Sequence, residues 1–152
     1  MKNDVSEAFI LNQSGVPMGP IALSVGASYT CALLPDGIYC SDTNSLGEFG
    51  DNSKTSTSSF THIVKSLTGI TSIATGTSHT CAINNGAAYC WGNNSNGQLG
   101  NNSTVSSNVP VAVQGLTSGV SAISAGFNSS CAIVSGSVMC WGHNSFGELG
   151  GK

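Results

Sequence analysis

The stretch that decides the fold runs from residue 79 to residue 100 and reads HTCAINNGAAYCWGNNSNGQLG. Related stretches begin 50 residues earlier, at Tyr29, and 50 residues later, at Ser129. All three keep two cysteines and two glycines at the same places, which are Cys31, Cys40, Gly47 and Gly50, then Cys81, Cys90, Gly97 and Gly100, then Cys131, Cys140, Gly147 and Gly150. A fixed period of this size predicts an array of similar supersecondary units rather than one irregular globule.

The middle copy contains the clearest hairpin signal. Asn85-Gly86 stands between two apolar runs, and this dipeptide strongly favours a two-residue hairpin turn. Such a turn places Cys81 directly opposite Cys90 as a non-hydrogen-bonded pair, with Cα atoms about 4.5 Å apart. This distance is at the near end of the range found in disulfides. The middle copy is therefore expected to carry a disulfide across its hairpin.

The flanking copies differ in their turns. Ser135-Gly136 keeps the two-residue register, whereas Pro35-Asp36-Gly37 favours a type I turn with a glycine bulge, which would offset the first two cysteines by one residue. A disulfide is still expected there. Zinc would need shorter spacings and four ligands that converge on one point, so we predict neither a metal site nor a cofactor. The predicted pairs are Cys31–Cys40, Cys81–Cys90 and Cys131–Cys140.

Each unit is expected to contain four short antiparallel strands and no helix. Beside the hairpin and the strand before it, a fourth apolar segment covers residues 108–113, matched by residues 59–64 and more loosely by residues 8–11. Small residues on both faces suit sheets stacked face to face, as in propeller blades. The fold class is therefore an all-β, partial β-propeller of three four-stranded antiparallel blades. We predict a single repeat domain over residues 1–152, with blades at about 8–41, 59–92 and 108–142.

The string from Trp91 to Gly100, with HTCAI upstream, closely resembles the repeat of the regulator-of-chromosome-condensation family. A second good copy starts at Trp141, whereas Ser41-Asp42 replaces Trp-Gly in the first copy. The resemblance covers nearly the whole chain and is weakest over residues 1–20. It implies four-stranded blades of a propeller that has seven blades in the family. Three repeats do not close such a ring, which leaves a fragment, an arc completed by other copies or chains, or an open stack.

The family's functions are diverse, and they include nucleotide exchange on a small GTPase with chromatin binding, light sensing and β-lactamase inhibition. Their common element is a protein-binding face, so the resemblance implies protein binding. The exchange activity depends on particular loops, and this sequence has neither a basic stripe nor a projecting hairpin that could carry it. We therefore do not assign that activity to the chain.

Composition excludes several classes of function. Charged residues make up 7% of the 152 residues, there are four lysines and no arginine, and the net charge is −3. Nucleic-acid binding depends on basic residues, so it is not expected.

His62, His79 and His143 occupy different repeat positions, so no catalytic triad recurs and we predict a protein that is not an enzyme. No apolar run is long enough to cross a membrane, and no signal peptide is visible. Paired cysteines nevertheless favour an extracellular or surface location.

Loop residues that differ between the copies are the candidates for recognition. We predict partner contacts at Tyr29, Phe127 and Phe146, although packing between blades is an equal alternative for these rings. The tryptophans are expected to pack between blades with their N–H groups bonded. Glu48, Gln98 and Glu148 are expected to stabilise turns. The leading hypothesis is a non-enzymatic protein-binding module that binds another protein. The alternative is a structural protein that binds further copies of itself through open blade edges, as a ring, layer or filament.

Overall fold

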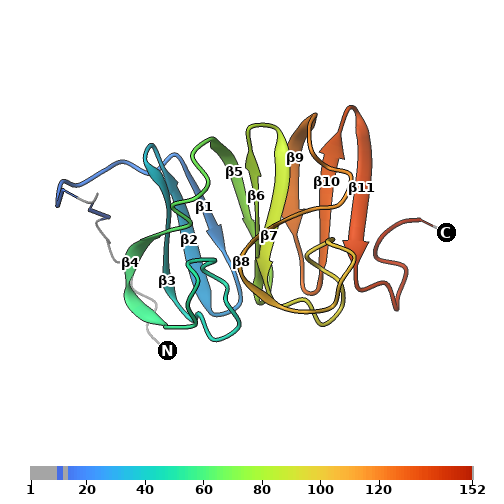
Figure 1. The fold of residues 1–152 in the computed structure, drawn as a ribbon, viewed down its shortest axis with the longest axis horizontal. Coiled ribbons are helices and arrows are strands. Elements are labelled where there is room, and N and C mark those ends of the chain that lie inside the picture. Colours follow the sequence, from blue (N-terminus) through green and yellow to red (C-terminus); the bar gives the residue numbers. More distant parts are fainter. Residues whose placement is uncertain (1–9, 12–13, 152) are drawn as a thin grey trace, which may run out of the picture.

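The protein, seen in a computed structural model, is described over residues 10–11 and 14–151, and this part contains eleven strands and no helix. The strands form three antiparallel sheets, which stand side by side along the long axis of the molecule (Figure 1). The strands are β1 (Ala22–Val25), β2 (Tyr29–Leu34), β3 (Gly37–Asp42), β4 (Thr57–Ile63), β5 (Ile70–Thr75), β6 (His79–Asn84), β7 (Ala87–Gly92), β8 (Ser107–Ala112), β9 (Val120–Ala125), β10 (Ser129–Val134) and β11 (Ser137–Gly142). This arrangement confirms the all-β class of stacked, blade-like sheets.

The division into blades differs from the prediction. The first sheet has the order β1-β2-β3-β4, the second β5-β6-β7-β8, and the third contains β9, β10 and β11 in the described part of the chain. The segments at 59–64 and 108–113 were predicted to open the second and third blades, and this is wrong because each closes the sheet before it. The blades therefore lie at about 22–63, 70–112 and 120–142. The physical reason is that β3 and β7 have an unpaired outer edge, and the next strand along the chain is the nearest that can fill it.

The N-terminal segment predicted to match these outer strands is only partly visible. Residues 8 and 9 lie outside the described residues. Leu11 forms an isolated antiparallel bridge with Pro17 instead of joining a sheet.

All three hairpins have the same two-residue register. Cys31 faces Cys40, Cys81 faces Cys90 and Cys131 faces Cys140, and the three Cα–Cα distances are 4.2, 4.1 and 4.0 Å. Each pair forms a disulfide, as predicted. The offset expected in the first copy is absent, since Leu34 pairs directly with Gly37. Gly37 has a φ of 138°, so a glycine directly after the turn takes up the distortion and the ladder keeps its register.

Each sheet packs one of its two faces on the opposite face of the next sheet. We call the face that carries a sheet's disulfide its leading face and the opposite face its trailing face. The leading face of the first sheet packs on Ile73, Ala82 and Trp91 of the second sheet's trailing face. The leading face of the second sheet packs in the same way on Ile123, Ala132 and Trp141. The first two disulfides thus lie in the cores between neighbouring sheets, where each joins the two central strands of its own sheet.

One hydrogen-bond pattern joins each sheet to the next. The carbonyl oxygen of Glu48 accepts the indole N–H of Trp91 at 2.8 Å and the hydroxyl of Thr80 at 2.7 Å. The carbonyl oxygen of Gln98 accepts Trp141 and Ser130 in the same way, both at 2.9 Å. The loop after one sheet therefore binds the trailing face of the next. This confirms the prediction that the tryptophans pack between blades with bonded N–H groups.

Glycine is required where the indole meets this loop. A Cβ atom on Gly50 would lie 2.7 Å from Cδ1 of Trp91, and one on Gly100 would lie 2.7 Å from Nε1 of Trp141. Both glycines also have positive φ values, 68° and 66°. Two independent constraints, space and backbone conformation, therefore explain why glycine recurs at this place in the repeat.

The buried indole is the first position that the structure allows us to test. We expect Trp91→Phe to lower the free energy of unfolding by about 2 kcal/mol, because it removes buried volume and one hydrogen bond to the Glu48 carbonyl. Trp141→Phe removes the equivalent bond at a half-buried site and should have a smaller effect. Urea unfolding of the oxidised chain measures both. Equal losses would contradict the dependence on burial.

Candidate protein-binding rim

Six loops gather at one end of the three sheets. Strands alternate in direction, so the short loops at residues 26–28, 76–78 and 126–128 and the long loops at 43–56, 93–106 and 143–150 emerge on the same side, at the lower edge of Figure 1. Backbone hydrogen bonds join them in pairs, from Thr43 to Ser28, Asn93 to Ser78 and His143 to Asn128, at 3.0, 2.8 and 2.9 Å. We call this surface the loop rim. The stacked sheets hold it as one continuous edge.

An asparagine side chain organises each long loop, buried in the first two copies and exposed in the third. In the second copy the side-chain oxygen of Asn94 accepts the Leu99 N–H at 3.0 Å, and its amide nitrogen donates to the carbonyls of Ser103 and Val105 at 2.9 and 3.0 Å. Asn44 makes the equivalent bonds in the first copy, and Asn144 accepts from Leu149 at 3.0 Å in the third. Sequence reasoning missed this role. The available signal was the recurrence of asparagine at the same place in all three copies.

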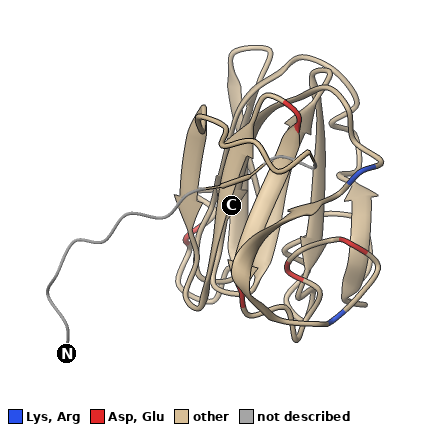
Figure 2. Ribbon diagram, turned by 90° about the vertical axis from the view of Figure 1, so that its left-hand side faces the viewer, with Lys and Arg blue, Asp and Glu red and all other residues tan. Residues whose placement is uncertain are grey.

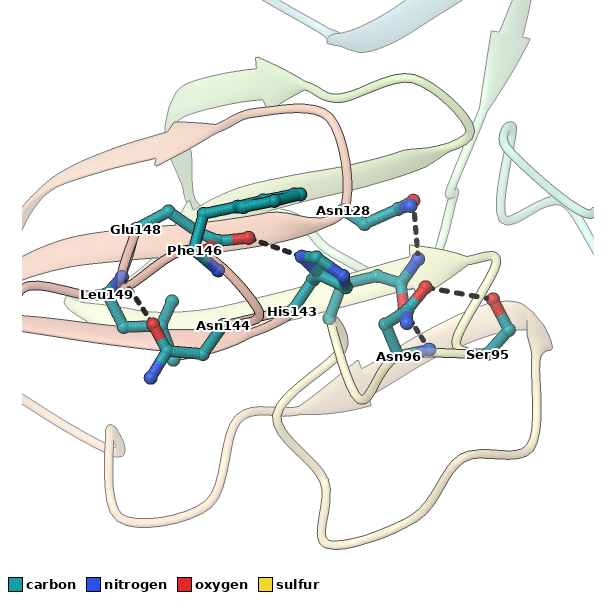
Figure 3. Close-up of polar contacts among 9 residues, drawn as sticks. Ser95, Asn96, Asn128, His143, Asn144, Phe146, Glu148 and Leu149 are labelled. Carbon is teal, nitrogen blue, oxygen red and sulfur yellow. Dashed lines mark hydrogen bonds and ion pairs between the residues drawn. The ribbon is translucent and has the colours of Figure 1, made fainter.

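A second polar side chain fixes the apex of each long loop. A carboxylate oxygen of Glu48 accepts the Leu46 N–H at 2.9 Å, and Gln98 and Glu148 do the same for residues 96 and 146 at 2.8 and 2.9 Å. This confirms the predicted turn-stabilising role. Figure 3 shows the third loop, where Glu148 also bonds Nδ1 of His143. The apex residue, which differs between copies, therefore sits on a backbone that its own loop holds in place.

Two of the three predicted contact residues lie exposed on this rim. The side chains of Phe127 and Phe146 are 74% and 92% exposed. The Phe146 ring lies beside the His143 ring, with centroids 6.1 Å apart (Figure 3). Their contact with a partner stays a prediction.

The third predicted contact, Tyr29, is wrong. Its side chain is 2% exposed, because residue 29 starts β2 on the leading face that also carries Cys31. Its hydroxyl donates to the backbone carbonyl of His79 at 2.5 Å. Burial raises the pKa of Tyr29 well above its ordinary value. Tyr29 therefore belongs to the contact between the first two sheets.

The rim has little charge of either sign. Lys54 and Lys65 are the only lysines among the described residues, and the sequence has no arginine. Figure 2 shows the charged residues scattered over the fold rather than gathered in a stripe. Backbone N–H groups of its own loop, and then His143, hold the pKa of Glu148 below its ordinary value. This carboxylate and the ring of His143 lie next to Phe146 (Figure 3). Most other polar residues of the rim loops are neutral, with amide or hydroxyl side chains. Such a surface suits a contact made through apolar and neutral polar groups.

His79 replaces Tyr29 in the second copy, and it is fully buried. The hydroxyl of Ser130 donates its proton to the backbone carbonyl oxygen of Gln98. Nε2 of His79 must therefore donate to the hydroxyl oxygen of Ser130, 2.9 Å away. Nδ1 then has no hydrogen-bond partner among the described residues. Burial lowers the pKa of His79 to about 4, against a smaller opposing effect of the Ser129 backbone. His79 is therefore a neutral structural residue between the second and third sheets.

Neither of two other kinds of site occurs among the described residues. No group of three or more histidine, cysteine, aspartate or glutamate side chains lies close enough to hold a metal ion. None of the described segments is a helix of the length and apolarity that crossing a bilayer requires.

The fold and rim define a class of protein: a β-propeller arc of repeated blades whose loops share one face. Two family models, both described as the regulator of chromosome condensation (RCC1) repeat, match residues 85–133 and residues 70–98. Residues 70–133 therefore carry repeats of the RCC1 type, on a fold of stacked, propeller-like blades. A comparison with curated protein sequences gave no match.

Solved structures of the same fold agree with this assignment. Prp20p from Saccharomyces cerevisiae is 25% identical with a TM-score of 0.72, over 88% of this chain and 33% of that one. Yeast RCC1 (Prp20) bound to Kap60 is 24% identical with a TM-score of 0.72, over 88% and 32%. Human WBSCR16 is 24% identical with a TM-score of 0.69, over 82% and 33%. The chain thus spans about a third of the length of these structures.

The buried histidine should make stability depend on pH. The pKa of His79 is about 4 in the folded chain against 6.5 ordinarily, so the unfolded chain takes up the proton first as the pH falls. The free energy of unfolding should drop by about 3 kcal/mol between pH 6.5 and 4 from this group, and no further below pH 4. In His79→Gln this part of the drop should be absent, as urea unfolding across the pH range would show. A His79→Gln profile that keeps the whole wild-type drop would contradict this account.

Glu48 and Glu148 hold equivalent loops, and their pKa values are shifted in opposite directions. Burial raises the pKa of Glu48, so its charged form destabilises the fold as the pH rises above 4.5. We expect Glu48→Gln, which copies Gln98, to be more stable than wild type at pH 7 and similar to it near pH 4. The pKa of the exposed Glu148 is lowered, so Glu148→Gln should bring no such gain. Thermal unfolding at both pH values compares the two variants, and a gain in both or in neither would contradict this account.

Proposed function

We propose that this chain is a non-enzymatic protein-binding module, extracellular or surface-associated, that binds its partner through the loop rim. The observation that carries the proposal is the exposure of Phe127 and Phe146 on loops whose backbones are already fixed. Large aromatic rings are frequent anchors of protein interfaces. Because hydrogen bonds from Asn144 and Glu148 hold the loop of Phe146, and a backbone bond from His143 holds Asn128 beside Phe127, little conformational entropy is lost when a partner binds.

The relatives support this proposal. The structure of Prp20p was reported together with its binding properties to Gsp1p and histones, and yeast RCC1 was solved bound to Kap60. Proteins with this fold thus bind other proteins. For this chain, which covers about a third of them, we propose protein binding without assigning any of those partners. Because the rim carries few charged side chains, it favours a partner surface with an apolar centre and neutral polar groups around it.

Two features support the other parts of the proposal. Three disulfides suit an oxidising environment, which favours an extracellular or surface location. The histidines give little basis for catalysis, because His79 is buried in a neutral state and His143 bonds a loop carboxylate. The roles that these side chains do fill are structural.

A paired substitution tests the rim. The oxidised chain, with a photoreactive amino acid at position 146, is exposed to secreted and surface proteins, and the crosslinked partner is identified and purified. The double variant Phe127→Ser, Phe146→Ser should bind that partner at least about tenfold more weakly, since loss of interface anchors typically costs more than 1 kcal/mol each. Its unfolding temperature should stay unchanged because both rings are exposed.

The matched control uses the far end of the same sheet. Val138 is 72% exposed, close to Phe127 in exposure, but it lies beside the hairpin turn opposite the rim. Val138→Ser should bind like wild type. A partner that binds the double variant and wild type equally well would overturn the rim as the binding surface.

A further inference from the structure

The leading face of the third sheet is open, unlike the same face of the other two. On the first and second sheets the residues around the disulfide are buried against the next sheet. On the third sheet Ile133 is 41% exposed and Val138 is 72% exposed, and both share the face of the Cys131–Cys140 disulfide. This face is distinct from the loop rim, and the inference below does not depend on rim binding.

The open face keeps the loop carbonyl and the glycine that receive the indole of a neighbouring sheet. Glu148 stands where Glu48 and Gln98 stand in the earlier copies, and within the described residues no indole or hydroxyl donates to its carbonyl oxygen. A Cβ atom on Gly150 would meet nothing within 4 Å. At Gly50 and Gly100 that space is filled by the indole of the next sheet. The third copy thus presents an acceptor and a space for an indole, and both are free.

We propose that this face docks one further blade of the RCC1 repeat type, whose indole N–H and hydroxyl both donate to the carbonyl oxygen of Glu148. The argument is continuity with two interfaces in the same chain. In each of them a leading face with a disulfide and two aliphatic residues meets a trailing face with alanine, tryptophan and a threonine or serine hydroxyl. The third leading face has the disulfide and the two aliphatic residues, and differs in having no outer strand among the described residues and Ser129 where Tyr29 and His79 stand.

The first sheet of a second copy does not fit this description. Its trailing face has Ser41 where Trp91 and Trp141 stand, so the indole donor is absent. Ala32, Leu34 and Tyr39 on that face are already packed with Ile10, Met18 and Phe60 of the same chain. The Tyr39 ring also stacks on His62, with centroids 4.8 Å apart. The two ends of the arc are therefore not complementary, and copies of this chain do not stack head to tail.

An extended chain tests the proposal. Residue 152 corresponds to residue 102, and residue 102 to residue 52, so appending a copy of residues 53–102 continues the repeat in register. The added unit supplies Thr80, Trp91 and a strand equivalent to β4. In the parent chain, Cys131–Cys140 is part-exposed and the other two disulfides are fully buried, so dithiothreitol should reduce it first. In the extended chain its reduction, followed by alkylation and mass spectrometry, should slow at least about tenfold.

Two control variants of the extended chain make the test specific. The first changes the added copy of Trp91 to serine, as at position 41, and should lose most of the protection of Cys131–Cys140. The second is Ile133→Arg, which leaves the parent chain's unfolding temperature unchanged because the site is exposed, and should abolish the protection. An extension that leaves the reduction rate unchanged, or controls that protect as well as the intact extension, would overturn the proposal.

The parent chain provides a further check. Light scattering over a range of concentrations should show no growing oligomers, and the reduction rate of Cys131–Cys140 should not depend on concentration. A dimer or larger assembly in which this disulfide becomes protected would show that a second copy occupies the face, and it would overturn the proposed occupant.

Discussion

A backbone carbonyl that accepts two side-chain donors from the neighbouring sheet is the interaction on which this fold depends. At Glu48 and at Gln98 the acceptor lies on a loop, and the donors lie on the trailing face of the next sheet. Three of these four bonds are buried, so their partners cannot turn to water instead, and breaking one would leave a polar group unsatisfied. They fix how far apart and in which register two sheets stand. The disulfides then join the strands of each sheet, whereas this carbonyl joins the sheets to one another.

The same loops also form the rim, so the contact that stabilises the stack and the surface proposed for recognition share one backbone. Asn94 holds its loop from inside, Gln98 holds the apex, and the carbonyl of Gln98 holds the next sheet. The apex side chain is the one part of the loop that none of these bonds constrains in identity. Leucine, asparagine and phenylalanine therefore occupy it in the three copies without a change in the loop. The fold can vary its rim at that position while it keeps its packing.

Much of the fold was predictable because local chemistry decides it. Asn85-Gly86 sets the hairpin register, the register sets the cysteine pairing, and the repeat carries both to the other copies. The partner of each outer strand was not predictable, because an apolar segment between two hairpins can pair with either. Tyr29 was placed on a loop although strand alternation from Cys31 would have put both on one face. The buried asparagines were missed because asparagine is ordinary in loops, and only its bonds distinguish it from a solvated residue.

The asymmetry of the two ends gives the stack a direction. The first sheet has its own cover from Ile10 and Met18, whereas each later sheet is received by a face that already exists before it in the chain. Contacts run only between neighbours, so each unit can become stable as soon as it and the loop before it are present. During synthesis the first sheet emerges before the second and the second before the third, so each leading face is present before the sheet that packs on it. The order in which the ribosome delivers the blades is thus the order in which their docking surfaces become available.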